Sequence, residues 1–159
     1  MKIRLAEQII DDKDVQMLIE WLNKTERFTK GSETVKFEQE WSSWLGSKYS
    51  VFVNSGSSAN LLIFLALLHS DKLRNKKVIV PAVSWVTTVS SPMILGYEPI
   101  VCDCDEEDLG FSLEHFETLC KQHNPSTAIA VHVLGHANKL KELQAICDKY
   151  DVSLIEDTC

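Results

Sequence analysis

Apolar residues in the first third of the chain recur at the spacing of an α-helix, in two stripes separated by a polar loop at 24–31. The two stripes are Val15, Leu18, Ile19 and Leu22, then Phe37, Trp41, Trp44 and Leu45. Asp12 and Ser32 precede the stripes and can cap the two helices. The pattern therefore predicts an N-terminal helical segment over residues 1–46.

From Tyr49 onward, short apolar runs alternate with helical periods. The predicted strands are 49–53, 78–80, 99–102, 128–133 and 152–155. The predicted helices between them are 57–68, an irregular stretch after Ser84 that contains Pro92, 112–121 and 138–150. Five strands joined by four crossovers predict an α/β fold with a mainly parallel sheet and helices on both faces, a three-layer α/β/α arrangement. We expect residues 1–159 to form a single domain.

Composition narrows the choice of partners and location. The 159 residues are 45% hydrophobic, and the formal net charge is −7, with basic residues scattered among acids. This arrangement argues against nucleic acid as a partner. The longest apolar run, 61–68, is far shorter than the roughly 20 residues that span a bilayer. The N-terminus lacks the features of a signal peptide, so we expect a cytoplasmic protein with no membrane association.

The cysteines give no indication of a metal site or a disulfide framework. There are five, an odd number, and none forms a C-x-x-C pair. Cys102 and Cys104 would share one face of a strand, but two thiolates without a third ligand make a poor metal site. We therefore expect reduced thiols and no bound metal.

The loops after the strands are the places to look for function, because ligands of such sheets bind outside the carboxyl ends of the strands. The first loop leads into a helix through Gly56, Ser57 and Ser58, which offer a tight turn, hydroxyls and free backbone N–H groups. A helix start of this kind favours a phosphate, although serines at a helix start more often serve only as caps. The glycine patterns of dinucleotide-binding folds, P-loops and hydrolase elbows are absent from the sequence.

Two further loops carry an aromatic ring and an acid. Trp85 follows the second predicted strand and could stack on a flat ring, or could simply fill the core. Asp157 follows the last strand and could meet a cationic ligand nitrogen, or could cap a helix. His132 and His136 follow the fourth strand at the same rim and are typical of polar loop residues.

Together these features predict a site for pyridoxal phosphate. The phosphate suits Ser57 and Ser58, the ring suits Trp85, and the pyridinium nitrogen suits Asp157, which would keep that nitrogen protonated. A protonated ring is the electron sink that stabilises a substrate carbanion.

The chain resembles the DegT/DnrJ/EryC1/StrS family of fold-type I pyridoxal-phosphate sugar aminotransferases. The resemblance rests on an ordered set of short stretches: 37–38, 45–46, 55–60 (Ser-Gly-Ser-Ser-Ala-Asn), 81–88, 96–103, 131–135 and 155–157. It implies that the chain is the N-terminal part of the large, cofactor-binding domain. It also implies that Gly56, Ser57 and Ser58 hold the phosphate, that Trp85 stacks on the ring and that Asp157 binds its nitrogen.

The resemblance further implies a homodimer, a nucleotide-linked keto-sugar as substrate, an amino donor such as glutamate, and a role in cell-surface polysaccharide biosynthesis. The family's Schiff-base lysine would lie beyond Cys159, so the sequence predicts a truncated product that lacks it. Segments 56–60, 83–89 and 134–136 are more similar to the sugar 3-dehydratase branch, which replaces this lysine with histidine and uses pyridoxamine phosphate. Aminotransferase, 3-dehydratase and an inert fragment that binds a nucleotide or sugar phosphate therefore remain alternatives.

Overall fold

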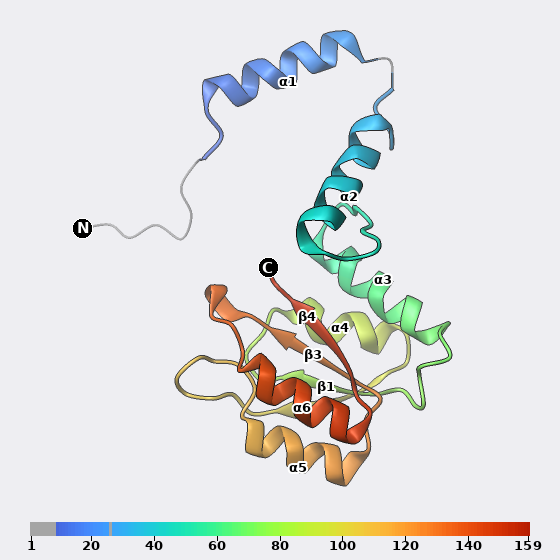
Figure 1. Cartoon of the computed structure of the whole chain (residues 1–159), viewed down its shortest axis with the longest axis vertical. Helices are drawn as coiled ribbons and strands as arrows, with labels where there is room; N and C mark the ends of the chain where they lie inside the picture. The colour runs from blue at the N-terminus through green and yellow to red at the C-terminus, as the bar shows by residue number, and fades with distance from the viewer. Residues whose placement is uncertain (1–8, 26) are drawn as a thin grey trace, which may run out of the picture. The chain divides into compact units, whose positions relative to one another are not determined.

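The computed structural model describes residues 9–25 and 27–159 (Figure 1). The elements in chain order are α1 (Asp12–Lys24), α2 (Ser32–Leu45), α3 (Gly56–Leu68), β1 (Lys77–Pro81), α4 (Val86–Ile94), β2 (Glu98–Cys102), α5 (Leu113–His123), β3 (Thr127–Val131), the short 3₁₀ turn η1 (Val133–Gly135), α6 (Leu140–Tyr150) and β4 (Ser153–Asp157). The chain divides into two compact units between Phe52 and Val53. Each unit is described by itself.

The first unit contains the two predicted helices, but the residues that cap them differ from those expected. Asp11, not Asp12, caps α1: its carboxylate accepts the backbone N–H of Asp14 at 3.0 Å, and the Asp14 carboxylate accepts the N–H of Asp11 in return. This reciprocal pair requires an acid three residues after the cap, which Asp14 provides for Asp11. Helix α2 begins after Gly31, so Ser32 lies inside the helix and the cap has no side-chain hydrogen bond.

The strand predicted at 49–53 is wrong. In the described chain this segment forms no strand, and its residues Tyr49, Val51 and Phe52 are exposed. The backbone N–H of Phe52 donates to the Glu38 carboxylate at 2.9 Å instead of to a neighbouring strand. Lys30 contacts the same carboxylate at 2.8 Å, and together these donors lower the pKa of Glu38. A short apolar run has the sequence pattern of a strand even where no neighbouring strand is available to pair with it.

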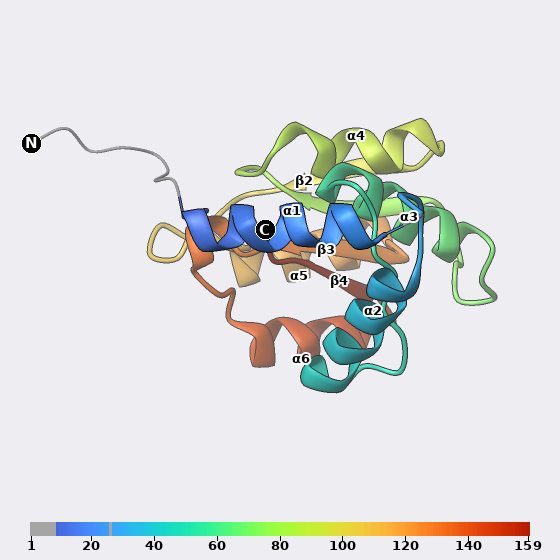
Figure 2. The same cartoon turned by 90° about the horizontal axis from the view of Figure 1, so that it is seen from above.

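The second unit is built on a four-stranded parallel sheet with the order β2-β1-β3-β4. Side chains alternate between its two faces. One face, with Val78, Val80, Ile129 and Ile155, packs against Phe64 of α3 and Val89 of α4. The other face, with Ile79, Cys102, Ala128 and Ala130, packs against the apolar sides of α5 and α6. Helices therefore cover both faces (Figure 2), which confirms the predicted three-layer α/β architecture.

The helix after Ser84 forms as α4 although Pro92, inside it, cannot donate a backbone hydrogen bond to the preceding turn. Two strand ends moved by a few residues: β3 stops at Val131, before a turn, and β4 continues to Asp157. As a result Asp157 is the last residue of a strand and not a loop residue.

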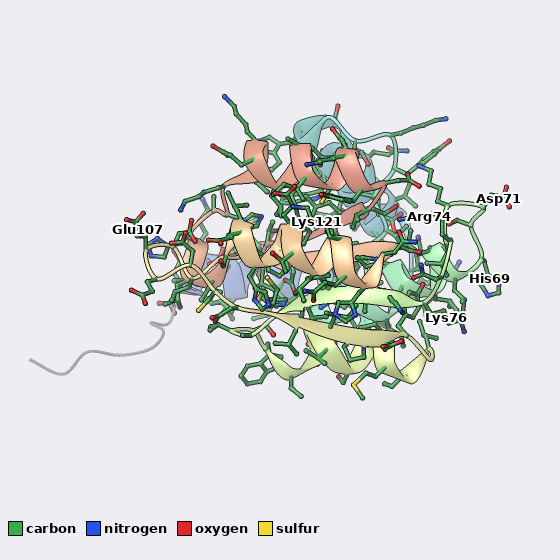
Figure 3. All side chains as sticks on the ribbon, turned by 90° about the horizontal axis from the view of Figure 1, so that it is seen from below. His69, Asp71, Arg74, Lys76, Glu107 and Lys121 are labelled. Atoms are coloured by element: carbon green, nitrogen blue, oxygen red, sulfur yellow. The ribbon has the colours of Figure 1, made fainter. Side chains whose placement is uncertain are left out.

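Arg74 links the C-terminal ends of α5 and α6 at the amino edge of the sheet. Its guanidinium donates to the backbone oxygens of Pro125, Tyr150 and Asp151 at 2.9, 3.1 and 2.7 Å, and to the side chain of Asn124 at 2.9 Å. Figure 3 shows Arg74 near Lys76 at one end of the unit and Glu107, in the loop after β2, at the opposite end. The amino and carboxyl edges of the sheet are thus clearly separated.

All five cysteines are free thiols. Cys102, Cys120 and Cys147 are buried, and burial raises the pKa of these thiols to about 12, 11 and 12. In the described ranges, no His, Cys, Asp and Glu side chains form a group of three or more that could hold a metal ion. No described helix combines the length and the apolar character needed to cross a membrane.

Candidate functional site

The candidate site lies at the carboxyl edge of the sheet, on the face covered by α3 and α4. Because all four strands run parallel, their carboxyl ends and the loops that follow meet at this edge. Side chains of β4 point alternately to the two faces of the sheet, so Asp157 lies on the face of Ile155 and Glu156 on the opposite face. The side chain of Ile155 packs in the layer formed by α3 and α4. The carboxylate of Asp157 therefore faces the same layer as the starts of these two helices.

The first turn of α3 leaves two backbone donors open. Ser55 caps the helix, since its hydroxyl accepts the N–H of Ser58 at 3.2 Å and its carbonyl accepts the N–H of Ala59 at 3.0 Å. The N–H groups of Gly56 and Ser57 precede the first helical bond, and no described residue accepts from them. The positive end of the helix dipole lies at the same place. This turn therefore offers an anion two N–H groups and the exposed Ser57 hydroxyl.

Ser58 and Gly56 shape this turn in different ways. The Ser58 hydroxyl donates to Asn54 at 2.7 Å, so it would contact an anion only by giving up that bond. A side chain built at Gly56 would meet no atom within 4 Å, so open space lies in front of the turn. The turn therefore presents backbone N–H groups to open space, as anion-binding helix starts do.

Trp85 stands at the start of α4 and does not fill the core. It is the N-cap residue of that helix, and 75% of it is exposed. An exposed indole presents a flat apolar surface on which a planar ring can stack. The other three tryptophans, Trp21, Trp41 and Trp44, are also exposed in the first unit, so none of the four is a core residue.

Asp157 is linked directly to α3. The amide Nδ2 of Asn60 lies 3.1 Å from Oδ2 of Asp157, and the backbone N–H of Cys159 donates to Oδ1 at 3.3 Å. Asn60 is 6% exposed, whereas Asp157 is only half-buried. The structure thus brings together the start of α3 and the end of β4, which the sequence placed in one site, and it sets Trp85 at the same edge on the neighbouring helix.

The donors and acceptors at this edge are complementary to a phosphate ester of a nitrogen-containing ring. Open N–H groups suit a phosphate, an exposed indole suits a flat ring, and a carboxylate suits a protonated ring nitrogen. The residues present therefore fit pyridoxal phosphate.

His132 belongs to a different network, on the α5 and α6 side of the sheet. Its Nδ1 accepts the backbone N–H of Asn138 at 3.1 Å, so in the neutral imidazole the proton sits on Nε2, 3.1 Å from Oε2 of Glu156. Since Glu156 and Asp157 point to opposite faces, His132 does not face the candidate site. His136 is exposed in the turn that follows β3.

Sequence reasoning assigned no role to Asn60 or Asn138, although both are buried polar hubs. Asn138 accepts the N–H of Phe111 at 2.9 Å and donates to the carbonyl of Val131 at 2.9 Å, which ties the loop after β2 to β3. Gly110 makes room for it, because a Cβ there would lie 2.5 Å from the Asn138 Oδ1. The available signal for Asn60 was a lone amide within an otherwise apolar helix.

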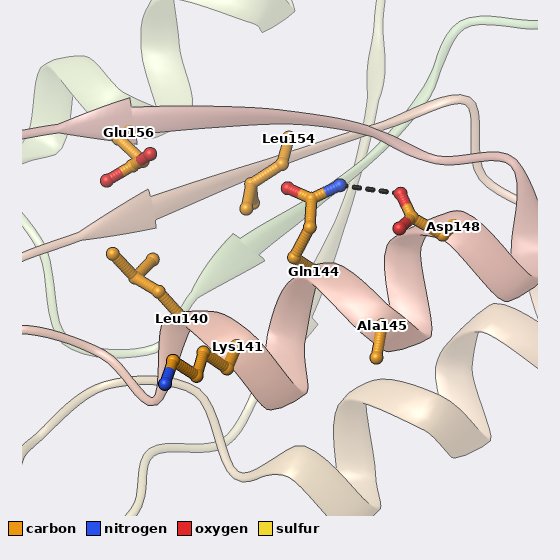
Figure 4. A pocket seen from close by; sticks show the side chains of 7 residues that line it. All are labelled: Leu140, Lys141, Gln144, Ala145, Asp148, Leu154 and Glu156. Carbon is orange, nitrogen blue, oxygen red and sulfur yellow. Dashed lines mark hydrogen bonds between the residues drawn. The ribbon is translucent and has the colours of Figure 1, made fainter.

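A separate hollow of about 450 Å³ lies between α6 and β4 (Figure 4). It is lined by Leu140, Lys141, Gln144, Ala145, Asp148, Leu154 and Glu156. Gln144 and Asp148 are joined across its wall at 2.7 Å. Because Leu154 and Glu156 point away from the Asp157 face, this hollow is not part of the candidate site.

Comparison with known proteins gives one consistent result. The profile of the DegT/DnrJ/EryC1/StrS aminotransferase family matches residues 8–159. The GDP-4-keto-6-deoxy-D-mannose 3-dehydratase of Yersinia pseudotuberculosis is 33% identical over 158 residues, which cover 98% of this chain and 40% of that protein. The chain thus spans about 40% of the length of this curated relative.

Solved structures agree with the fold. The corresponding 3-dehydratase of E. coli, with bound hydrated PLP, matches with a TM-score of 0.88 and 32% identity, over 98% of this chain and 40% of that one. The Helicobacter pylori aminotransferase PseC matches with a TM-score of 0.86 over 99% of this chain and 42% of that one, but its 23% identity supports the fold alone.

Proposed function

The chain belongs to the DegT/DnrJ/EryC1/StrS aminotransferase family, and we propose that it forms the cofactor-binding part of a pyridoxal-phosphate enzyme acting on a nucleotide-linked keto-sugar. One observation carries the proposal: open donors at Gly56 and Ser57, the exposed ring of Trp85 and the carboxylate of Asp157 occur at one edge, on one face, of a parallel sheet. Each group matches a different part of this cofactor.

In this proposal each residue has a distinct task. Gly56 and Ser57 hold the phosphate through backbone N–H groups and one hydroxyl, while Ser58 keeps the turn in shape and lies within reach of the anion. Trp85 covers one face of the ring and excludes water from it. Asp157 accepts the N–H of the ring nitrogen and keeps its proton in place. The bound cofactor supplies an electron sink for a substrate carbanion.

Between the reactions known for this family, we favour a sugar 3-dehydratase over an aminotransferase. Two curated relatives, at 33% and 34% identity, are named as 3-dehydratases of a GDP-linked 4-keto-6-deoxy sugar, whereas the aminotransferase compared is 23% identical. The residue that distinguishes the two, histidine or lysine, corresponds to a position after Cys159. A homodimer, glutamate as amino donor and a cytoplasmic role in polysaccharide synthesis remain parts of the proposal.

The cofactor site is tested by titrating the purified chain with pyridoxal phosphate, pyridoxal and inorganic phosphate, following near-ultraviolet absorbance and tryptophan fluorescence. We expect pyridoxal phosphate to bind more tightly than either of the other two, because only it engages both the helix start and Asp157. Equal affinity for pyridoxal phosphate and inorganic phosphate would instead identify a simple anion-binding module. Absence of saturable binding would contradict the proposal.

The reaction class is tested on the intact protein with glutamate, pyridoxal phosphate and a GDP-linked 4-keto-6-deoxy sugar. Mass spectrometry of the sugar product distinguishes loss of the 3-hydroxyl from replacement of the keto oxygen by an amine. We expect loss of the hydroxyl. An aminated sugar would show that the aminotransferase alternative holds.

A further inference from the structure

The buried amide of Asn60 is unusual for its place in α3. After its first turn this helix is apolar except for Asn60, which is buried on the same side as the fully buried Phe64, one turn later. Burying an amide costs free energy unless it is hydrogen-bonded, and asparagine forms helices less well than leucine. A leucine at this place would need no hydrogen-bond partner, so the partner of the amide is the feature that needs an explanation.

The described partner of this amide is the carboxylate of Asp157. Asn60 donates to Oδ2 at 3.1 Å, and the backbone N–H of Cys159 donates to Oδ1 at 3.3 Å. A carboxylate has about four lone-pair positions, so these two bonds fix its orientation and leave room for a third donor. Asp157 is only half-buried, so that third donor can come from outside the protein.

Asn60 also stands at a defined distance from the anion-binding turn. It follows Gly56 by four residues, which places it about 6 Å further along the helix axis. Its bond to Asp157 crosses from α3 to the last strand of the sheet. The separation between the open N–H groups and the carboxylate is therefore set by a rigid helix and one hydrogen bond.

We propose that Asn60 is a positioning residue that holds the Asp157 carboxylate at a fixed reach from the first turn of α3. One ligand can then be bound by its phosphate and its ring nitrogen at the same time, without reordering of the acid. Asn60 acts through Asp157 and does not itself contact the ligand. This inference rests on the proposed function and adds a residue to its site.

The test compares wild type with Asn60→Leu and Asn60→Asp in titrations with pyridoxal phosphate. Asn60→Leu removes a buried amide, so we expect stability equal to or above wild type, together with about tenfold weaker binding, the size expected for one hydrogen bond to a charged group. We expect a changed near-ultraviolet spectrum of the bound cofactor and unchanged affinity for inorganic phosphate. Asn60→Asp sets two carboxylates against each other and should weaken binding further.

Two controls separate positioning from folding. In an Asp157→Asn background, Asn60→Leu should cause no further loss of affinity, because residues that act through one another are not additive. Tyr97→Phe removes a different buried bond on the same face, the 2.9 Å bond from its hydroxyl to the Phe64 carbonyl. This control should lower stability but leave affinity and spectrum as in wild type.

The possible failures are distinguishable. If wild type binds pyridoxal phosphate and Asn60→Leu binds it equally well, or if the two losses simply add, Asn60 has no positioning role and the proposed function still stands. If wild type does not bind pyridoxal phosphate, the proposed function fails and this inference fails with it.

Discussion

Ser55 and Ser58 form a closed cap at the start of α3, in which the Ser55 hydroxyl accepts the N–H of Ser58 at 3.2 Å. This cap satisfies the inner donors of the first turn and leaves those of Gly56 and Ser57 for a ligand. The four serine and glycine residues of this short stretch therefore have separable tasks. Some of them stabilise the helix, and others face outward.

Ser57→Ala should therefore change ligand affinity, whereas Ser55→Ala should change stability. Removing the Ser57 hydroxyl should weaken pyridoxal phosphate binding about fivefold, equivalent to about 1 kcal/mol, with little change in stability. Removing the Ser55 cap should lower the free energy of unfolding by about 1 kcal/mol. Calorimetric titration and chemical denaturation of both variants measure these effects. A stability loss confined to Ser57→Ala would reverse the assignment.

Trp85→Ala should weaken binding of pyridoxal phosphate about tenfold, because a stacked ring contributes about 1 kcal/mol or more. The indole is 75% exposed, so unfolding free energy should change by less than about 0.5 kcal/mol. Trp85→Phe should retain part of the affinity. Trp44→Ala, which removes a similarly exposed indole from the first unit, is the matched control and should leave affinity unchanged. Fluorescence titration decides between these outcomes, and equal losses in Trp85→Ala and Trp44→Ala would rule out specific stacking.

Most of the second unit could be predicted from the sequence because its pattern is local. The apolar runs at 78–80 and 99–102 lie within β1 and β2. Each stretch whose apolar residues recur at helical spacing overlaps an observed helix. The run at 49–53 had the same local pattern but no strand to pair with, and pairing is a non-local property. This is why four of the five predicted strands formed.

For the candidate site, the sequence could predict which loops meet at one edge of the sheet, but not the bonds between their side chains. Parallel topology places the residues after each strand at one edge, which brought Ser57, Trp85 and Asp157 into one hypothesis. The bond between Asn60 and Asp157 joins positions 97 residues apart, and nothing in either local sequence specifies it. Likewise, the face on which His132 lies follows from strand register, which short apolar runs do not fix.

Arg74 should be the main stabilising residue at the edge remote from the candidate site. Its guanidinium donates to carbonyls at or just after the C-terminal ends of α5 and α6, for which the described residues supply no other donor. Arg74→Ala should lower the free energy of unfolding by about 2 kcal/mol. Arg74→Lys keeps the charge but loses the fork of donors, so most of the loss should remain. Denaturant unfolding measures both; full stability of Arg74→Lys would show that charge alone matters.

Glu117 should make stability depend on pH in the acid range. Hydrogen bonds from Lys149 at 2.7 Å and Tyr150 at 3.0 Å lower its pKa from 4.5 to about 2. Because the folded state favours the ionised carboxylate, its contribution is present above about pH 4.5 and is lost as pH falls toward 2. The stability difference between wild type and Glu117→Gln should therefore shrink over this interval.

Thermal unfolding of both proteins between neutral and acid pH measures that difference. Glu106→Gln is a suitable control, since the Glu106 carboxylate makes no ion pair with any residue the structure describes. A constant difference for Glu117→Gln down to the lowest pH would contradict the assigned contacts.

The most direct test of the account is an amide and indole NMR titration of the labelled chain with pyridoxal phosphate. If three loops form one site, the backbone signals of Gly56 and Ser57, the indole N–H of Trp85 and the side-chain amide of Asn60 should shift together with a single dissociation constant. Signals of Lys141 and Gln144, in the hollow on the opposite face, should stay in place. Shifts confined to that hollow, or different affinities for the helix start and Trp85, would contradict a shared site.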